Sequence, residues 1–312
     1  MSETLNPRQA YGEELLALGK DNPNVVVLEA DLGKSTISYL FGQAFPERYF
    51  EMGIAEQNML STGAGLAAAS KIAFCSTFSV FISGRAYDQV RQAIAIGRLN
   101  VKLCGSSAGL SDFGDGSTHQ SVEDIALMCA IPGMTVLTPC DAYETRLAVR
   151  AAAEIEGPVF IRVVRNDLPA ILPKGAAFSH EPRLLKEGKD ILLLAHGSMT
   201  SRAIEAAKLL EAQNISAAVV NIGTIKPFPY EQIAQMASKF KAVITAEDHS
   251  YIGGLTAATA LALCKSTVPL DYVAIEDSFG QSARTLADLM NHYGLTAENI
   301  AHKAKALLER MA

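Results

Sequence analysis

The sequence lacks tryptophan, a block of basic residues and any CxxC pair of cysteines. Its 27 Lys and Arg against 33 Asp and Glu give a formal charge of −6, which argues against nucleic acid as the main partner. Five cysteines without histidine-flanked pairs indicate neither a disulfide framework nor a structural zinc site, so we expect a reducing, cytoplasmic setting. The densest apolar run, residues 191–195, is far shorter than the roughly 20 residues that cross a bilayer. The first residues do not resemble a signal peptide either, and we expect no role at a membrane.

The chain is long enough for one large α/β domain or two of ordinary size, with 312 residues of which 49% are hydrophobic. Asn6 is a candidate helix cap and Pro7 suits the first helical position, which predicts a first helix that ends near Gly19. Helical stretches then alternate with short β-branched runs, a pattern that favours a mostly parallel sheet covered by helices. The predicted strands are 25–28, 72–74, 101–104, 135–137 and 159–164.

Between residues 170 and 189 this periodicity gives way to proline, glycine and scattered charges, a composition typical of a linker. After it the alternation starts again. The predicted elements are strands 191–195, 217–222 and 242–246 and helices 202–213, 230–240 and 255–264. We therefore predict an α/β protein of two domains split near residue 180, with residues 1–178 in the first and 179–312 in a smaller second domain.

Three short motifs resemble known sites, but the residues around each of them do not fit the site. Gly33-Lys34-Ser35 looks like the end of a P-loop, yet Leu28 stands where that loop needs glycine. Gly63-Ala64-Gly65 lies inside an alanine-rich helical stretch, which favours close helix packing over dinucleotide binding. His196-Gly197-Ser198 has Thr200 in place of the closing glycine of a nucleophile elbow, so serine hydrolase chemistry has little support.

Three other segments are not explained by folding alone. Residues 51–58 place Glu56 in a weakly polar stretch before a small-residue helix, where a carboxylate is costly to desolvate. Residues 77–81 carry two phenylalanines three positions apart, and residues 114–120 form a glycine-rich turn with an acid and an imidazole. Each has a structural alternative when taken alone: an exposed or capping Glu56, two core aromatics, and a solvated turn.

The order of these segments resembles one family. The segments are GIAEQ (53–57), STF (76–78), RAYDQV (85–90), DGSTHQ (115–120) and PCDAYE (139–144). In this order they resemble the pyrimidine-binding and C-terminal domains of the transketolase family, which includes the deoxyxylulose-phosphate synthases, from residue 8 to about 306. In length the chain is similar to the C-terminal subunit of split bacterial transketolases, in which the two halves of the enzyme are separate polypeptides.

The resemblance implies thiamine diphosphate as the cofactor. Glu56 would hydrogen-bond the pyrimidine ring and help its amine to deprotonate the thiazolium carbon, a role that burial in apolar surroundings favours by destabilising the anion. Phe81 would stack on the aminopyrimidine, with Phe78 lining the same pocket. Gly84 replaces a tyrosine that the family carries, and nearby Tyr87 is the candidate for that space. The implied cofactor contacts are Glu56, Phe78, Phe81 and Tyr87, with Asp31 as a supporting residue.

The resemblance also assigns contacts to the substrate. Arg8, Ser35 and Arg165 match positions that hold the sugar phosphate, and guanidinium groups suit phosphate because they bind its oxygens in two-point geometry. Asp115 and His119 match residues that contact the donor hydroxyls and the reacting carbons, which gives His119 a catalytic role.

Two departures from the family pattern predict an unusual donor. Ser107 stands where transketolases carry a histidine that touches the substrate, and Gly114 stands where an acid precedes the Asp-Gly pair. The smaller Ser107 leaves room for a branched sugar such as apulose 4-phosphate, or for a sulfonated ketose.

The family binds the diphosphate and its Mg²⁺ through a separate domain with a Gly-Asp-Gly motif, for which this sequence offers no suitable copy, so we assign it no metal ligands. The resemblance therefore implies an N-terminal transketolase subunit as partner, active sites at the shared interface of a heterotetramer, and phosphorylated sugars as substrates. Two alternatives stay open: the β subunit of a 2-oxoacid dehydrogenase, which has no use for the phosphate-binding set, and a non-catalytic partner subunit. His249 either reaches the substrate channel or is a packed or solvated histidine.

Overall fold

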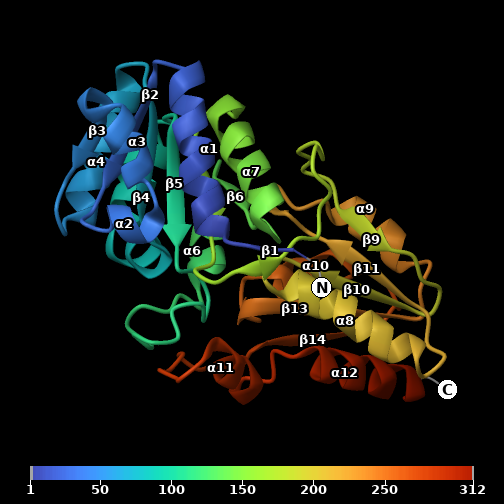
Figure 1. Cartoon of the computed structure of the whole chain (residues 1–312). Coiled ribbons are helices and arrows are strands. Elements are labelled where there is room, and N and C mark those ends of the chain that lie inside the picture. Colours follow the sequence, from blue (N-terminus) through green and yellow to red (C-terminus); the bar gives the residue numbers. More distant parts are fainter. Residues whose placement is uncertain (1–2, 311–312) are drawn as a thin grey trace.

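The short β-branched runs of the sequence form the strands of two large sheets in the computed structural model, which describes residues 3–310 (Figure 1). A third sheet has only two strands, in which residues 4–5 pair antiparallel with residues 168–169. The strands are β1 (Thr4–Leu5), β2 (Val25–Glu29), β3 (Tyr49–Glu51), β4 (Ile72–Phe78), β5 (Val101–Ser106), β6 (Thr135–Leu137), β7 (Val159–Arg162), β8 (Leu168–Pro169), β9 (Arg183–Lys186), β10 (Ile191–Ala195), β11 (Ala217–Asn221), β12 (Thr224–Lys226), β13 (Ala242–Ser250) and β14 (Leu270–Ile275). Each of the two large sheets is covered by helices, so the predicted α/β class with two domains is confirmed.

The helices fill the segments between these strands. The α-helices are α1 (Pro7–Asp21), α2 (Gly33–Thr36), α3 (Tyr39–Ala44), α4 (Glu56–Ala68), α5 (Tyr87–Gln89), α6 (Asp124–Ala130), α7 (Ala142–Glu154), α8 (Met199–Glu211), α9 (Tyr230–Ala237), α10 (Leu255–Ala262), α11 (Leu286–His292) and α12 (Ala297–Glu309). A 3₁₀ turn, η1 (Pro46–Arg48), and two π-helical turns, η2 (Phe81–Arg85) and η3 (Val90–Ala95), complete the set.

Helix α1 begins as its sequence predicts. The side chain of Asn6 accepts hydrogen bonds from the backbone N–H groups of Arg8 and Gln9, and Pro7 is the first helical residue. The helix ends at Asp21, two residues beyond the predicted end, because the predicted Gly19 is helical and buried against Phe41. The cap therefore fixes the entry of the chain into the first domain.

The first sheet has the order β12-β6-β7-β5-β4-β2-β3, and every neighbouring pair except β12 and β6 is parallel. Strands β2 and β5 are buried along their whole length, as expected for a parallel sheet with helices on both faces. Apolar residues of α1 and α7 pack on one face, and those of α4, α6 and η3 pack on the other. All parallel strands of this sheet consequently end at one edge.

The second sheet has the order β14-β13-β10-β11-β9. Strands β14, β13, β10 and β11 are parallel, and β9 pairs antiparallel with β11. Helices α8 and α12 lie over one face in the view of Figure 1, where α8 contributes Ala203 and Leu210 to the core. The opposite face joins the core of the first domain through Ile225 and Phe228, so one apolar cluster runs through both domains.

The structure corrects several predicted boundaries. The predicted linker, residues 170–189, contains β9, because its short polar strand has too few residues to show an alternating pattern. The predicted turn at residues 226–229 is preceded by β12, which leaves the second domain and pairs with β6 of the first. Helix α8 begins three residues before the predicted start, α9 ends at Ala237 instead of residue 240, and β13 continues four residues beyond the predicted end.

Candidate active site

The predicted site residues of the first domain follow the ends of neighbouring parallel strands. Asp31 comes two residues after β2, Phe78 is the last residue of β4, and Ser107 follows β5 directly. The carboxyl ends of parallel strands meet at one edge of a sheet, which is where ligands bind in open α/β folds. Figure 1 shows the arrowhead of β5 pointing toward the second domain, so this edge lies near the junction of the two domains.

Glu56 is the first residue of α4 and is 1% exposed, which excludes the alternative of an exposed glutamate. Both of its carboxylate oxygens accept a hydrogen bond of 2.9 Å from Nη1 of Arg85. The sequence predicted apolar surroundings for Glu56, and the structure differs in one respect. The carboxylate is buried, but its charge is paired with the guanidinium of Arg85. Residue 85 lies 29 positions away, so local sequence could not reveal the pair.

Phe78 and Phe81 form a pair of nearly parallel rings, with centroids 6.0 Å apart and an interplanar angle of 15°. The imidazole of His119 meets both rings edge-on, at centroid distances of 6.1 and 5.4 Å. The guanidinium carbon of Arg85 lies 4.4 Å from the centroid of Phe81. Glu56, Arg85, the two phenylalanines and His119 thus form one continuous cluster, which we call the ring cluster.

His119 belongs to a loop that touches both domains. Gly116 has a φ of 81°, a conformation that side chains other than glycine rarely adopt, and this shapes the turn between Asp115 and His119. The side-chain amide of Gln120 donates hydrogen bonds to the carbonyls of Asp112 and Gln281, the second of which lies in the second domain. Asp115 is exposed, so the loop presents its acid to solvent and its imidazole to the ring cluster.

The predicted substrate residues Arg8, Ser35 and Arg165 come together at the start of α1. Nη1 of Arg8 donates to the carbonyl of Ser35 at 2.9 Å, and Nη1 of Arg165 donates to Asp112 at 3.0 Å. Burial lowers the pKa of Arg8, and the positive charge of Arg165 lowers it further. Two neighbouring guanidinium groups repel each other, and an anion between them relieves this repulsion.

Two of the predicted contacts sit on strained backbone. Asp31 and Ser107 have φ values of 59° and 53°, in the left-handed region that favours glycine. The hydroxyl of Ser107 is buried and has no hydrogen-bond partner in the part of the chain that the structure describes. Strain and an unpaired hydroxyl at a strand end are typical of binding sites. Asp31 is exposed, and its backbone N–H donates to Glu51.

Tyr87 is not part of the ring cluster as defined above, although α5 contacts η2, the turn that begins at Phe81. Tyr87 begins α5 and packs against the main apolar core, and its ring stacks with neither Phe78 nor Phe81 among residues 3–310. A side chain at Gly84 would meet no atom within 4 Å, so the space beside this glycine is open. The role of Tyr87 at the cofactor stays a prediction.

A second charged cluster lies at the domain junction, which sequence reasoning missed. Arg162 of β7 donates from Nε to Asp124 at 2.9 Å and from Nη1 to Asp248 of β13 at 2.7 Å. Ser79, next to Phe78, donates to Asp124 at 2.7 Å. We call Ser79, Asp124, Arg162 and Asp248 the junction cluster. An arginine inside an apolar strand run was the signal that could have predicted it, because buried charges require partners.

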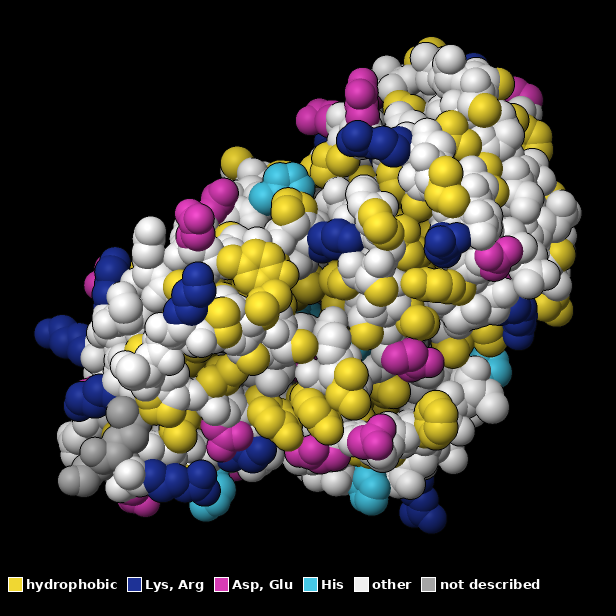
Figure 2. Space-filling model, turned by 180° about the vertical axis from the view of Figure 1, so that it is seen from behind, with side chains coloured by type: hydrophobic (Ala, Val, Ile, Leu, Met, Phe, Trp, Pro, Cys, Tyr) yellow, Lys and Arg dark blue, Asp and Glu magenta, His cyan; other side chains and the backbone are white. Residues whose placement is uncertain are grey.

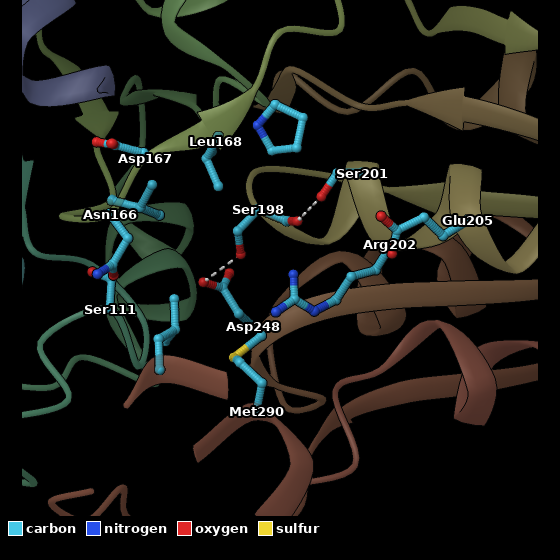
Figure 3. A pocket seen from close by; sticks show the side chains of 13 residues that line it. Ser111, Asn166, Asp167, Leu168, Ser198, Ser201, Arg202, Glu205, Asp248 and Met290 are labelled. Carbon is cyan, nitrogen blue, oxygen red and sulfur yellow. Dashed lines mark hydrogen bonds between the residues drawn. The ribbon is translucent and has the colours of Figure 1, made fainter. Parts of the chain in front are cut away.

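Next to the junction cluster is a cavity of about 170 Å³ between the domains. Figure 3 shows Asn166, Asp167 and Leu168 on one side of it and Ser198, Ser201 and Arg202 on the other, with Asp248 at its wall. Ser198 donates a hydrogen bond of 3.1 Å to Asp248. Val164 and Asn166, the two sequence neighbours of Arg165 of the candidate substrate site, both line this cavity.

His249 is fully buried, which decides between the two roles that its sequence left open. Its Nδ1 is 2.6 Å from the carbonyl of Ser250, and its Nε2 accepts the backbone N–H of Ala126. The contact of Nε2 joins β13 to α6, whereas Nδ1 contacts a carbonyl of β13 itself, so His249 is packed inside the protein with both ring nitrogens engaged.

Glu29 is a further carboxylate at the site edge that sequence reasoning missed. It ends β2, is fully buried, and accepts hydrogen bonds from the N–H of Leu32 and the hydroxyl of Thr36. Burial raises its pKa to about 8, and the negative charge of Glu51 contributes. Glu29 is therefore protonated near neutral pH.

Within residues 3–310 no helix is long and apolar enough to cross a membrane. Over the same residues, no three His, Cys, Asp or Glu side chains are grouped so that they could hold a metal ion.

Comparison with known families divides the chain into two segments, and among the strands of residues 3–310 only β12 pairs with a sheet outside its own segment. Residues 3–170 match the family described as transketolase, pyrimidine binding domain, and residues 181–300 match transketolase, C-terminal domain. A solved structure of a split-gene transketolase, described as an inactive β4 tetramer, superposes with a TM-score of 0.90 at 44% identity. The match covers 98% of this chain and 99% of that one.

Relatives of similar length carry related names. A protein of Methanocaldococcus jannaschii named as a transketolase C-terminal section is 41% identical, over 97% of this chain and 96% of its own length. A 6-deoxy-6-sulfo-D-fructose transketolase subunit of a Clostridium species is 40% identical, with coverages of 97% and 94%. One of the subunits of an apulose-4-phosphate transketolase of Phocaeicola vulgatus is 31% identical, with both coverages at 97%.

Proposed function

The chain belongs to the transketolase family, and on that premise we propose that it is the subunit of a two-component enzyme that contributes the pyrimidine side of the active site. The reaction moves a two-carbon ketol unit from an anionic ketose to an aldose acceptor. The observation that carries the proposal is the ring cluster, in which a buried Glu56 and the ring of Phe81 contact the same Arg85 guanidinium near the carboxyl edge of the first sheet. We also propose a cytoplasmic location, from the cysteine pattern of the sequence.

The residues present fit one end of thiamine diphosphate. When bound, this cofactor supplies the thiazolium carbon that attacks the donor carbonyl. Phe81 offers a flat ring for stacking, and Glu56 offers a buried carboxylate for a ring nitrogen. The Arg85 guanidinium, a planar cation, contacts both Glu56 and the Phe81 ring in this structure. This supports the fit of another planar N–H donor at the same two side chains. His119, which lies edge-on to both phenylalanines, would contact the reacting carbons of the substrate there.

We propose that the diphosphate and Mg²⁺ are held by an N-terminal transketolase subunit, in a heterotetramer with shared active sites. The relatives named as subunits or as a C-terminal section support a partner of this kind. Figure 2 shows hydrophobic side chains gathered across one face of the molecule between its charged groups. Ile54, two residues before Glu56, is largely exposed, as is Ile96. Such exposed apolar side chains beside a site are typical of a surface that a partner covers.

We propose that the ketose donor carries a phosphate or a sulfonate group. Arg8 and Arg165 supply two adjacent cations, and Arg8 contacts the backbone carbonyl of Ser35. Asp115 and His119 would contact the sugar hydroxyls. Ser107 is small and its hydroxyl is unpaired among the described residues, so it leaves both space and a polar contact for an unusual ketose. The relatives named for sulfofructose and apulose 4-phosphate make these two donors the first to test.

The decisive experiment is reconstitution with the partner subunit, thiamine diphosphate and Mg²⁺, followed by Glu56→Gln. Loss of the carboxylate should lower kcat by about 10²- to 10⁴-fold, the range for a positioned acid–base group. Asp88→Asn, which removes an exposed carboxylate in α5, is the matched control and should leave kcat unchanged. Unchanged turnover in Glu56→Gln would instead indicate a non-catalytic subunit.

The substrate class has its own test. Arg165→Met should raise the KM for an anionic ketose by about 10- to 100-fold, since a charge-assisted hydrogen bond contributes roughly 1.5–3 kcal/mol. Lys34→Met, which removes a cation close to Ser35, should have little effect. Oxidation of 2-oxo acids with an artificial electron acceptor, together with no ketose turnover, would favour a 2-oxoacid dehydrogenase β subunit.

A further inference from the structure

Arg85 makes, within this chain, both of the contacts proposed for the aminopyrimidine ring. Its Nη1 donates to the two carboxylate oxygens of Glu56 at 2.9 Å, and its guanidinium lies 4.4 Å from the ring centroid of Phe81. A guanidinium is planar and presents N–H donors in a fixed fork. In shape and in hydrogen bonding it is a substitute for an amino-substituted heterocycle.

The two ends of this contact differ in exposure. The side chain of Glu56 is 1% exposed and that of Arg85 is 47% exposed, so only the arginine has a direct path to solvent. The backbone of Arg85 is held separately, because the side-chain amide of Gln57 donates to its carbonyl at 3.1 Å. The space next to Gly84 is open. The guanidinium can therefore leave the carboxylate while the main chain of η2 stays in place.

We propose that Arg85 is a built-in occupant of the pyrimidine subsite, which pairs with Glu56 and covers Phe81 until the cofactor displaces it. This inference rests on the function proposed above. Before assembly Arg85 neutralises a buried carboxylate that would otherwise be left unpaired, a costly state. At assembly the cofactor exchanges with the guanidinium, whose charge returns to solvent.

A resident competitor lowers the apparent affinity of the incoming ligand by the fraction of subsites that are free. The contacts to be broken are one partly exposed ion pair and one cation–π contact, each of modest strength. Removal of the guanidinium should consequently tighten cofactor binding by about 3- to 30-fold. A residue that held the cofactor in place would give the opposite sign.

The test measures the Kd of thiamine diphosphate for the complex reconstituted with its partner, by isothermal titration calorimetry at fixed Mg²⁺. Arg85→Ala should lower this Kd by about 3- to 30-fold, and Arg85→Lys should lie between it and the wild type, since ammonium lacks the planar fork. Arg91→Ala, which removes an exposed arginine from the adjacent η3, is the matched control and should leave the Kd unchanged.

A second readout uses the unassembled full chain. Arg85→Ala should lower its thermal unfolding midpoint, and Arg91→Ala should not. In the Glu56→Gln background the tightening caused by Arg85→Ala should shrink, because the carboxylate no longer holds the guanidinium. If Arg85→Ala raises the Kd of thiamine diphosphate or leaves it unchanged, the inference is overturned. The proposed function still stands in that case, provided that the wild-type complex binds the cofactor. Absence of cofactor binding to the wild-type complex overturns both.

Discussion

The ring cluster and the junction cluster both bury carboxylates against an arginine, but the two arginines differ in access to water. The side chain of Arg85 is 47% exposed, whereas that of Arg162 is 1% exposed and lies between two carboxylates that are also buried. Burial alone would lower the pKa of Arg162, but the charges of Asp124 and Asp248 outweigh it and raise that pKa. One arginine is placed to be released and the other to hold the domains together.

The largest loss of stability is expected when the junction cluster is broken. Arg162→Met leaves two buried carboxylates without a cation and should reduce the free energy of unfolding by about 3–5 kcal/mol. Arg85→Met should cost only about 1–2 kcal/mol, because water can reach the carboxylate that it uncovers. Urea unfolding of the two variants checks the difference. Equal losses would show that the exposure of the arginine does not separate the two clusters.

Glu29 extends the comparison to a buried carboxylate without an arginine. Its pKa is raised to about 8, so the native state holds its proton more tightly than the unfolded state does. The stability from this group is complete below its ordinary pKa of 4.5 and is lost as the pH rises to about 8. Glu29→Gln should therefore be more stable than the wild type by about 2–3 kcal/mol at pH 9. Thermal unfolding at pH 5 and 9, with the exposed Glu47→Gln as control, measures this; a constant difference at both values would contradict it.

Lys102 is the converse, a buried cation without a carboxylate. Its ammonium group donates to the carbonyls of Ile155 and Gly157, and desolvation lowers its pKa to about 7. Between pH 7 and its ordinary pKa of 10.5, the unfolded state binds more protons, so stability rises with pH. Lys102→Met should remove about 1–2 kcal/mol of this rise between pH 7 and 9. Unfolding curves across that range that keep the wild-type slope in the variant would refute the assignment.

The smallest expected effect lies outside both clusters. Asn6 caps α1 and also donates to the carbonyl of Arg165 and to Asp167. Asn6→Ala should cost about 1 kcal/mol of stability, the usual value for a lost N-cap. The same variant should weaken substrate binding slightly by loosening Arg165. A KM shift as large as that of Arg165→Met would mean that the cap itself belongs to the substrate site.

Sequence reasoning was most accurate where the signal is local. The cap at Asn6, the start of the first helix and the strands 135–137 and 191–195 were predicted correctly from short patterns. It failed where a segment takes its structure from a distant partner. Strand β12 has three residues and exists because β6 of the other domain pairs with it. The domain boundary after residue 178 stays a prediction for the same reason, because β12 lies beyond it in the sequence and yet pairs with a strand of the first domain.

In the candidate site, too, local motifs identified residues that lie together, whereas contacts between distant residues were not predicted. The family motifs singled out Glu56, Phe78 and Phe81, and the structure brings these three together, although their roles remain proposals. The motif RAYDQV contains Arg85, yet nothing in that motif shows that its side chain meets Glu56. Glu29 was overlooked because an acid at the end of an apolar run looks like a surface residue until both faces of the sheet are covered.

By itself the sequence determined the alternation of helices and strands and the family to which the chain belongs, because caps, β-branched runs and motifs act over a few residues. Only the tertiary structure decided which charges meet. Arg85 and Glu56 are 29 residues apart, Arg162 and Asp124 are 38 apart, and Arg162 and Asp248 are 86 apart. The strength of an ion pair depends on distance and burial, and both arise only when the sheets have packed.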